Sequence, residues 1–300
     1  MMHLELFGNT IIIDLAKGTI SSKLLGITML IYLLCMAGNF AYLFFRGKKF
    51  HDALMGLAAL GFAAHTAGLG FRWYESYQIG YGHIPLANFY ESLVSLSWTT
   101  MIVFFYIELR YKVKLMGSLV FPIISIAMAY ASLNPNVQSE ITPLIPALQS
   151  NWLTYHVLTC FLAYSSFAVS FVTSIVYLFK AGSHELAGQP PVKSTDVIPS
   201  LEAIDEIIYK TIAIGFLLLT VGIITGSVWA NYAWGSYWSW DPKETWSLIT
   251  WFIYAAFLHA RLTRDWRGRR AAIISIAGFL CVLFTFLGVN YLLSGLHSYA

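Results

Sequence analysis

Long apolar stretches separated by short polar segments dominate the chain. Crossing a bilayer as a helix takes about 20 mostly apolar residues. Residues 1–23 are too short and too interrupted by polar positions to cross, so we expect an interfacial segment there. The pattern predicts an all-α, polytopic integral membrane protein with a transmembrane domain over residues 24–300. Its eight expected spans are residues 24–45, 53–71, 88–108, 115–133, 153–179, 207–229, 246–263 and 271–293.

Composition supports a membrane protein, with 58% hydrophobic and 11% charged residues and a mean hydropathy of +0.65. No basic segment and cleavage site precede the first span, so we expect no removable signal peptide. The longest polar link, about 180–206, contains Gly182, Gly188 and Pro190-Pro191. It is typical of a flexible tether, here between a portion of five spans and a portion of three.

The basic residues divide unequally between the two sets of loops. Lys and Arg gather on the cytoplasmic side of membrane proteins, and one set of loops has fourteen of them against four in the other. We therefore expect both termini, and the loops at 72–87, 134–152 and 229–246, to be extracytoplasmic. The net charge of +3 follows from this bias and does not indicate nucleic-acid binding.

Six of the ten tryptophans fall between residues 229 and 251. Tryptophan also forms interfacial belts, but a belt spreads its rings over many helix ends. Rings concentrated in one loop suit a large planar ligand. We expect a ligand platform in the loop of about 229–246, formed by Trp229, Trp234, Trp238 and Trp240.

Histidines provide the chemistry that such a platform lacks, because imidazole is the usual axial ligand of haem iron. His156 lies at the outer end of the fifth span and His297 just beyond the outer end of the eighth. Two axial ligands of one iron need this equal depth, although water could also satisfy two interfacial histidines. The chain has no C-x-x-C-H motif, so we expect no covalent haem of its own.

His259 lies within the seventh span, about 20 Å from its outer end at 1.5 Å per residue. An ionisable residue at that depth is a candidate functional residue, although a neighbouring helix could satisfy a neutral imidazole. His65 lies roughly 10 Å nearer the outer surface. The two are poor partners for one iron, so a ligand from another chain suits His259 better. The remaining histidines at positions 3, 51, 83 and 184 are expected at the surface.

Asp241-Pro242-Lys243-Glu244 begins the seventh span with the residues of a capping box. That structural role explains these four residues without a ligand. A helix N-terminus can also favour a propionate, so Asp241 is a candidate cofactor-binding residue. Arg72 and Lys243 are further candidates for binding propionates, with an ordinary interfacial position as the alternative.

The segment Trp234-Gly-Ser-Tyr-Trp-Ser-Trp-Asp-Pro-Lys-Glu-Thr-Trp246 resembles the tryptophan-rich WWD signature of haem-handling proteins. Its Asp-Pro-Lys-Glu form resembles the CcsA (ResC) family of System II cytochrome c biogenesis. Arg72-Trp73 and Pro85-Leu-Ala-Asn-Phe-Tyr-Glu91-Ser-Leu also resemble that family's outer loop. The resemblance covers about residues 25–300.

The resemblance implies a subunit of a cytochrome c synthase that works with a CcsB (ResB)-like membrane protein. It implies haem b moved across the bilayer and presented for thioether attachment to the C-x-x-C-H motif of apocytochrome c. His156 and His297 would ligate an outer haem, and His259 an intramembrane haem whose other ligand belongs to the partner. The membrane would be the bacterial inner membrane or the thylakoid. The alternatives are a haem carrier without ligation chemistry and a b-type cytochrome for electron transfer.

Overall fold

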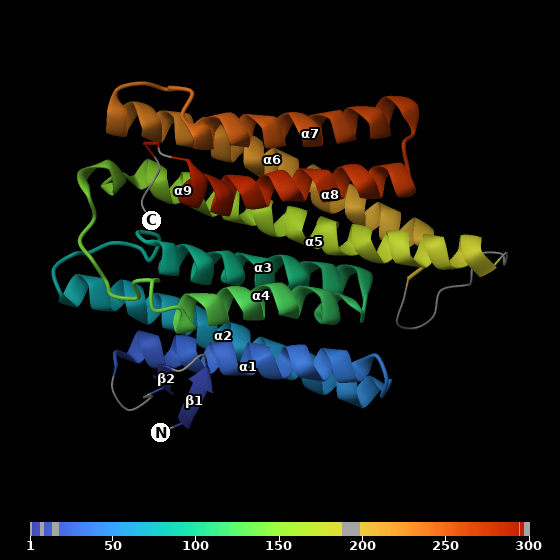
Figure 1. Cartoon of the computed structure of the whole chain (residues 1–300), viewed down its shortest axis with the longest axis horizontal. Helices are drawn as coiled ribbons and strands as arrows, with labels where there is room; N and C mark the ends of the chain where they lie inside the picture. Colours follow the sequence, from blue (N-terminus) through green and yellow to red (C-terminus); the bar gives the residue numbers. More distant parts are fainter. Residues whose placement is uncertain (1, 7–8, 14–17, 188–198, 294, 297–300) are drawn as a thin grey trace. The chain divides into compact units, whose positions relative to one another are not determined.

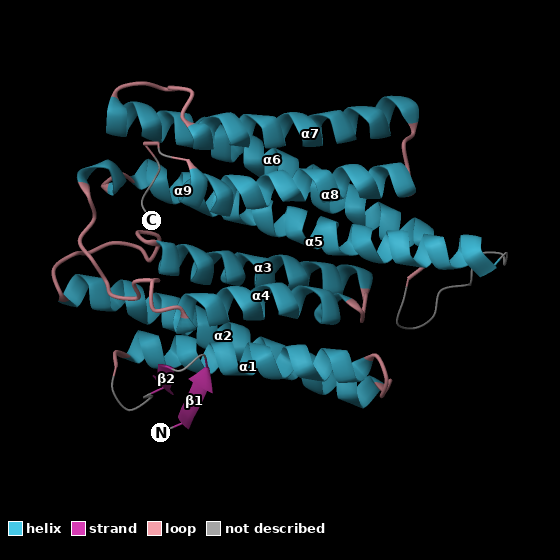
Figure 2. Ribbon diagram, viewed as in Figure 1, coloured by secondary structure: helices cyan, strands magenta, loops and turns pink. Residues whose placement is uncertain are grey.

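The chain is almost entirely helical in a computed structural model that describes residues 2–6, 9–13, 18–187, 199–293 and 295–296 (Figure 1). An N-terminal hairpin pairs β1 (Met2–Leu6) with β2 (Asn9–Ile13), with Met2 opposite Ile13. Figure 2 shows these strands beside the helices. The long helices are α1 (Ile20–Tyr42), α2 (Lys48–Gln78), α3 (Phe89–Tyr111), α4 (Met116–Leu133), α5 (Asn151–Ala187), α6 (Leu201–Trp234), α7 (Pro242–Arg264) and α8 (Arg269–Leu283).

Seven helices within the described residues are long and apolar enough to cross a membrane, and the protein is a polytopic integral membrane protein. The eighth expected span, residues 246–263, forms α7. This helix has 23 residues, enough to cross, but its polar ends and interior make it less apolar than the other seven. Seven of the eight predicted spans thus correspond to helices of that character, and the eighth corresponds to a long helix that is less apolar.

Several boundaries differ from the expected ones. α1 begins at Ile20, because Thr19 caps it by accepting a hydrogen bond from the Ser22 N–H. α2 extends beyond residues 53–71 at both ends. The tether is shorter than 180–206, since α5 continues to Ala187 and α6 begins at Leu201; residues 188–198 lie outside the described part.

The chain divides into two compact units, and the first comprises residues 1–98 and 121–144. Within it α1 packs along α2 (Figure 1). Gly61 permits the close approach, because a Cβ there would lie 2.9 Å from the Tyr32 ring. The Tyr32 hydroxyl lies 3.2 Å from Nδ1 of the fully buried His65, and its ring contacts Phe121 of α4.

The second unit comprises residues 99–120 and 145–300. Its centre is the pair of α5 and α6, with α8 on α5 and α7 on α8 (Figure 1). Gly215, Gly222 and Gly226 of α6 all face α5, where added Cβ atoms would meet Phe167, Cys160 and His156. Small residues on one face let two helices approach closely in a membrane.

The end of the last helix in this unit is irregular. α8 continues into a π-helical turn, η2 (Phe284–Gly288), and then into the short α9 (Val289–Leu292). Insertions of this kind change which side chains share a helix face and recur at functional sites. The irregular turn directly precedes α9, whose Asn290 contacts the Asp-Pro-Lys-Glu segment described below.

Candidate functional site

His156 lies in the first turns of α5, and its ring occupies a recess on α6 in the second unit. A Cβ at Gly226 would lie 2.5 Å from Nδ1 of His156, so only glycine leaves room for the ring. The Trp229 ring is nearly parallel to the imidazole, with centroids 5.8 Å apart. The close approach of Gly226 and the nearly parallel Trp229 ring therefore restrict how the His156 ring can turn.

The hydrogen bonding of His156 also selects a tautomer. Nδ1 lies 2.7 Å from the carbonyl oxygen of Gly222, which can only accept. Nδ1 must therefore carry the proton, and Nε2 then keeps its lone pair. A backbone carbonyl that holds one ring nitrogen in this way is the usual outer partner of a metal-ligating histidine. The hydrogen bonding of His156 is therefore that of a histidine that can ligate haem iron.

The tryptophans form two edge-to-face pairs instead of one flat wall. Trp229 and Trp234 have ring centroids 4.8 Å apart, and Trp238 and Trp240 have centroids 5.8 Å apart. Trp229 is 2% exposed, and its Nε1–H donates to the carbonyl of Ala147. Trp229 therefore contacts the His156 ring from a buried position, whereas Trp240 is 69% exposed.

The predicted loop of 229–246 is shorter in the structure. α6 continues to Trp234 and ends at Gly235, whose φ of +76° suits a left-handed helix cap; α7 begins at Pro242. Trp240 has a φ of +60°, which is strained for a bulky residue. Glu244 holds this strained turn, since its carboxylate accepts from the N–H groups of Ser239 and Asp241.

Asp241 and Lys243 connect the start of α7 to the C-terminal region. The Asp241 carboxylate accepts from the Lys243 N–H through Oδ1 and from the Leu296 N–H, at 2.6 Å, through Oδ2. The capping box expected from the sequence is present. The Lys243 ammonium donates to Oδ1 of Asn290 at 2.7 Å.

His297 and the residues after it lie outside the described part of the chain, so its role stays a prediction. His259 is described and lies on α7. Its side chain is exposed, on a stripe of exposed residues that includes Ile249, Phe252 and Ala256. Phe257 and Arg261, two residues before and after it, are buried, so α7 turns His259 away from its own unit.

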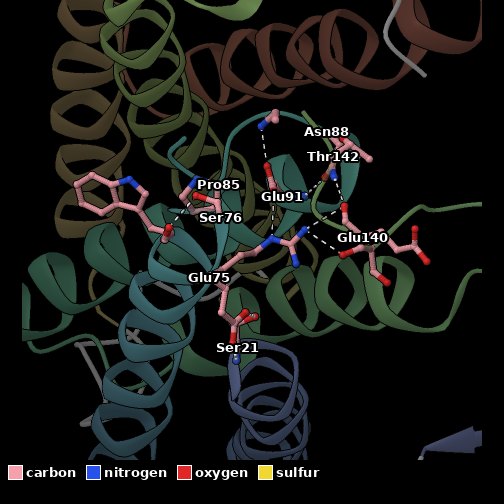
Figure 3. Close-up of polar contacts among 12 residues, drawn as sticks. Ser21, Glu75, Ser76, Pro85, Asn88, Glu91, Glu140 and Thr142 are labelled. Carbon is pink, nitrogen blue, oxygen red and sulfur yellow. Dashed lines mark hydrogen bonds and ion pairs between the residues drawn. The ribbon is translucent and has the colours of Figure 1, made fainter. Parts of the chain in front are cut away.

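Arg72 lies in the first unit, near the C-terminal end of α2. Its guanidinium is buried, donates to the Glu91 carboxylate at 2.7 Å and donates to the Ser139 carbonyl at 2.9 Å. Figure 3 shows Glu91 with Asn88 and Glu140 around this ion pair. A propionate would have to compete with these contacts, and binding by Arg72 remains a prediction.

His83 is buried, although the sequence predicted a surface position. Its Nε2 lies 2.9 Å from the Thr142 carbonyl, and its main chain pairs with Ser76. His83 thus joins the segment after α2 to the segment after α4 within the first unit. No signal in the sequence marks this pairing, because the two segments are about 60 residues apart.

Comparison with known proteins identifies the family. A family model described as "Cytochrome C assembly protein" matches residues 86–297. A protein from Guillardia theta named "Cytochrome c biogenesis protein CcsA" is 43% identical and aligns over 78% of this chain and 81% of its own. The protein of that name from Mesostigma viride is 40% identical over 97% and 98% of the two chains.

A solved structure shares the fold. The chain named "Cytochrome c Heme Lyase CcmF" superposes with a TM-score of 0.63 at 16% identity. The match covers 94% of this chain and 49% of that one, so this chain spans about half of its length. On the sequence matches, the chain belongs to the CcsA family of cytochrome c biogenesis proteins, and its role is in cytochrome c maturation.

Proposed function

We propose that this protein delivers haem b to the extracytoplasmic surface and presents it to the C-x-x-C-H motif of apocytochrome c. The observation that supports the proposal most strongly is the way the His156 ring is held by its neighbours on α6. Its Nδ1–H donates to the Gly222 carbonyl oxygen, its ring lies nearly parallel to the Trp229 ring, and its Nε2 has the lone pair that can ligate iron. His297, at the C-terminal end of the chain, supplies the opposite axial ligand.

Haem is the cargo in this proposal, and the protein orients it. Each thioether forms when a cysteine thiol adds across a haem vinyl group, with sulfur joining one carbon and hydrogen the other. The exposed Trp240 and its edge-to-face neighbour Trp238 contact the porphyrin edge and hold the vinyl groups towards the substrate. The histidines hold the iron until the histidine of apocytochrome c displaces one of them.

His259 ligates a second haem within the membrane, together with a histidine of a CcsB (ResB)-like partner. Its exposure on the outer face of α7 supports this role. A polar ring that faces lipid is costly, whereas a partner helix packed on this face would cover it. The mixed composition of α7 also suits a helix surrounded by protein better than one facing lipid.

Co-expression with a CcsB-like partner and an apocytochrome c tests the function. We expect haem-stained cytochrome c only when both membrane proteins are present and the apocytochrome keeps its C-x-x-C-H cysteines. Haem that reaches the outer surface without covalent product would indicate a haem carrier. Haem that shuttles electrons but never leaves the complex would indicate a b-type cytochrome.

Cysteine labelling tests the proposed orientation. Gln138 is exposed after α4 and Gly47 is exposed between α1 and α2, where nothing lies within 4 Å of an added Cβ. We expect Gln138→Cys to react with an impermeant maleimide in intact cells or right-side-out vesicles, and Gly47→Cys to react only after permeabilisation. The unmodified protein, with Cys35, Cys160 and Cys281, is the control. The reverse pattern would contradict the assignment of His156 to the outer side.

A further inference from the structure

The carboxylate of Asp241 has two tasks, and only one concerns its own helix. Oδ1 caps α7 by accepting from the Lys243 N–H, whereas Oδ2 accepts from the Leu296 N–H, 55 residues away along the chain. Asp241 is buried, although Leu296 itself is exposed. The bond to Leu296 is therefore formed by a side chain that has little freedom to move.

Two further observations indicate that the C-terminal segment is fitted to this carboxylate. An added Cβ at Gly295 would clash with Oδ2 of Asp241, so glycine is needed for the approach. Two residues after Asp241, Lys243 donates to Asn290 on α9, the last helical turn before this segment. The Asp-Pro-Lys-Glu segment thus contacts the C-terminal region at two points.

We propose that Asp241 is a positioning residue for His297, which follows Leu296 directly in the sequence. Asp241 fixes the main chain immediately before that histidine and so sets where its imidazole is presented to haem. Lys243 supports the same region through Asn290. This inference rests on the proposed function, in which His297 is an axial ligand, and gives Asp241 and Lys243 a task other than contact with a propionate.

Two variants separate this task from helix capping. In Asp241→Asn the side chain has a single acceptor oxygen, so the N–H groups of Lys243 and Leu296 can no longer both be satisfied. Gly295→Ala leaves the α7 cap unchanged and pushes the C-terminal segment off the carboxylate. Ser200→Ala is the control, because it removes the side-chain cap of α6 and leaves the C-terminal region unchanged.

The first measurement needs no haem. Hydrogen exchange of the Leu296 amide in the detergent-solubilised chain should become about 10- to 100-fold faster in Gly295→Ala, because its bond to a charged acceptor is lost. Asp241→Asn should show either this acceleration or a loss of protection in the first turn of α7. Unchanged exchange at Leu296 in Gly295→Ala, and at both places in Asp241→Asn, would overturn the anchoring.

The second measurement uses the full chain with its co-expressed partner, in a His259→Ala background so that only the outer haem is observed. We expect Gly295→Ala to weaken haem binding by about 10- to 100-fold and to shift the haem towards a high-spin spectrum. Measured against the His259→Ala parent given the same imidazole, the Gly295→Ala variant should regain the low-spin spectrum because imidazole replaces His297, which it would not do for a misfolded protein. Faster exchange with an unchanged spectrum would overturn the positioning role. If His297→Ala itself leaves the spectrum unchanged, His297 is not an axial ligand. That result would contradict the proposed function and not only the positioning role of Asp241.

Discussion

Replacing His156 by alanine is expected to abolish cytochrome c maturation while the protein still inserts in the membrane. The imidazole is held against Gly226 and Trp229, and it is the group through which this site would ligate iron. Under the proposed function, the outer haem would then lose its orientation and its iron would oxidise more readily. The measurement is haem-stained cytochrome c in cells that also contain the partner, normalised to the amount of the variant in the membrane.

Gly226→Ala tests the same site without removing the ligand. The added methyl group would overlap Nδ1 of His156, and overpacking of this kind costs about 1–3 kcal/mol unless the ring moves. We expect the ring to leave the Gly222 carbonyl and maturation to fall sharply. Gly182→Ala, on α5 with nothing within 4 Å of its Cβ, is the matched control. Equal activity of the two glycine variants would argue against a fixed imidazole.

Replacing His259 by alanine is expected to remove most of the intramembrane haem that co-purifies with the complex. Because this side chain is exposed on α7, its loss should leave the packing of the unit unchanged. Added imidazole should restore part of the haem and of the activity by filling the vacated position. Phe252→Leu, on the same exposed stripe, is the control. Full haem and full activity in His259→Ala would show that the histidine has no ligand role.

The sequence predicts the helices well because hydropathy acts on every residue of a span. It predicts the ends less well. α2 continues past residue 71 through Trp73, Tyr74 and Tyr77. These side chains have low hydropathy values, but their apolar rings and polar groups suit a membrane–water interface. α7 was expected to resemble the other spans, yet it is less apolar than they are. The sequence alone does not say whether the exposed face of this helix contacts lipid or a partner protein.

The site was predicted only in part. The sequence proposed His156 and the tryptophans as site residues, but it did not predict that Trp229 belongs to a helix and contacts the imidazole from a buried position. Gly235, a common helix terminator, was the available signal for the end of α6. The contacts of Asp241 with Leu296 and of Arg72 with Glu91 join residues 55 and 19 positions apart. Pairings of this kind depend on tertiary structure and have no local pattern.

The absorption spectrum of the His156→Cys variant, purified with its partner in a His259→Ala background, tests the central claim most directly. If His156 ligates the outer haem, thiolate replaces imidazole on the iron, so haem should be retained in part and its Soret band should shift away from the bis-histidine position. The parent with His156 intact and the His156→Ala variant provide the two reference spectra. An unchanged low-spin bis-histidine spectrum in both His156 variants would contradict the claim that this residue holds the haem.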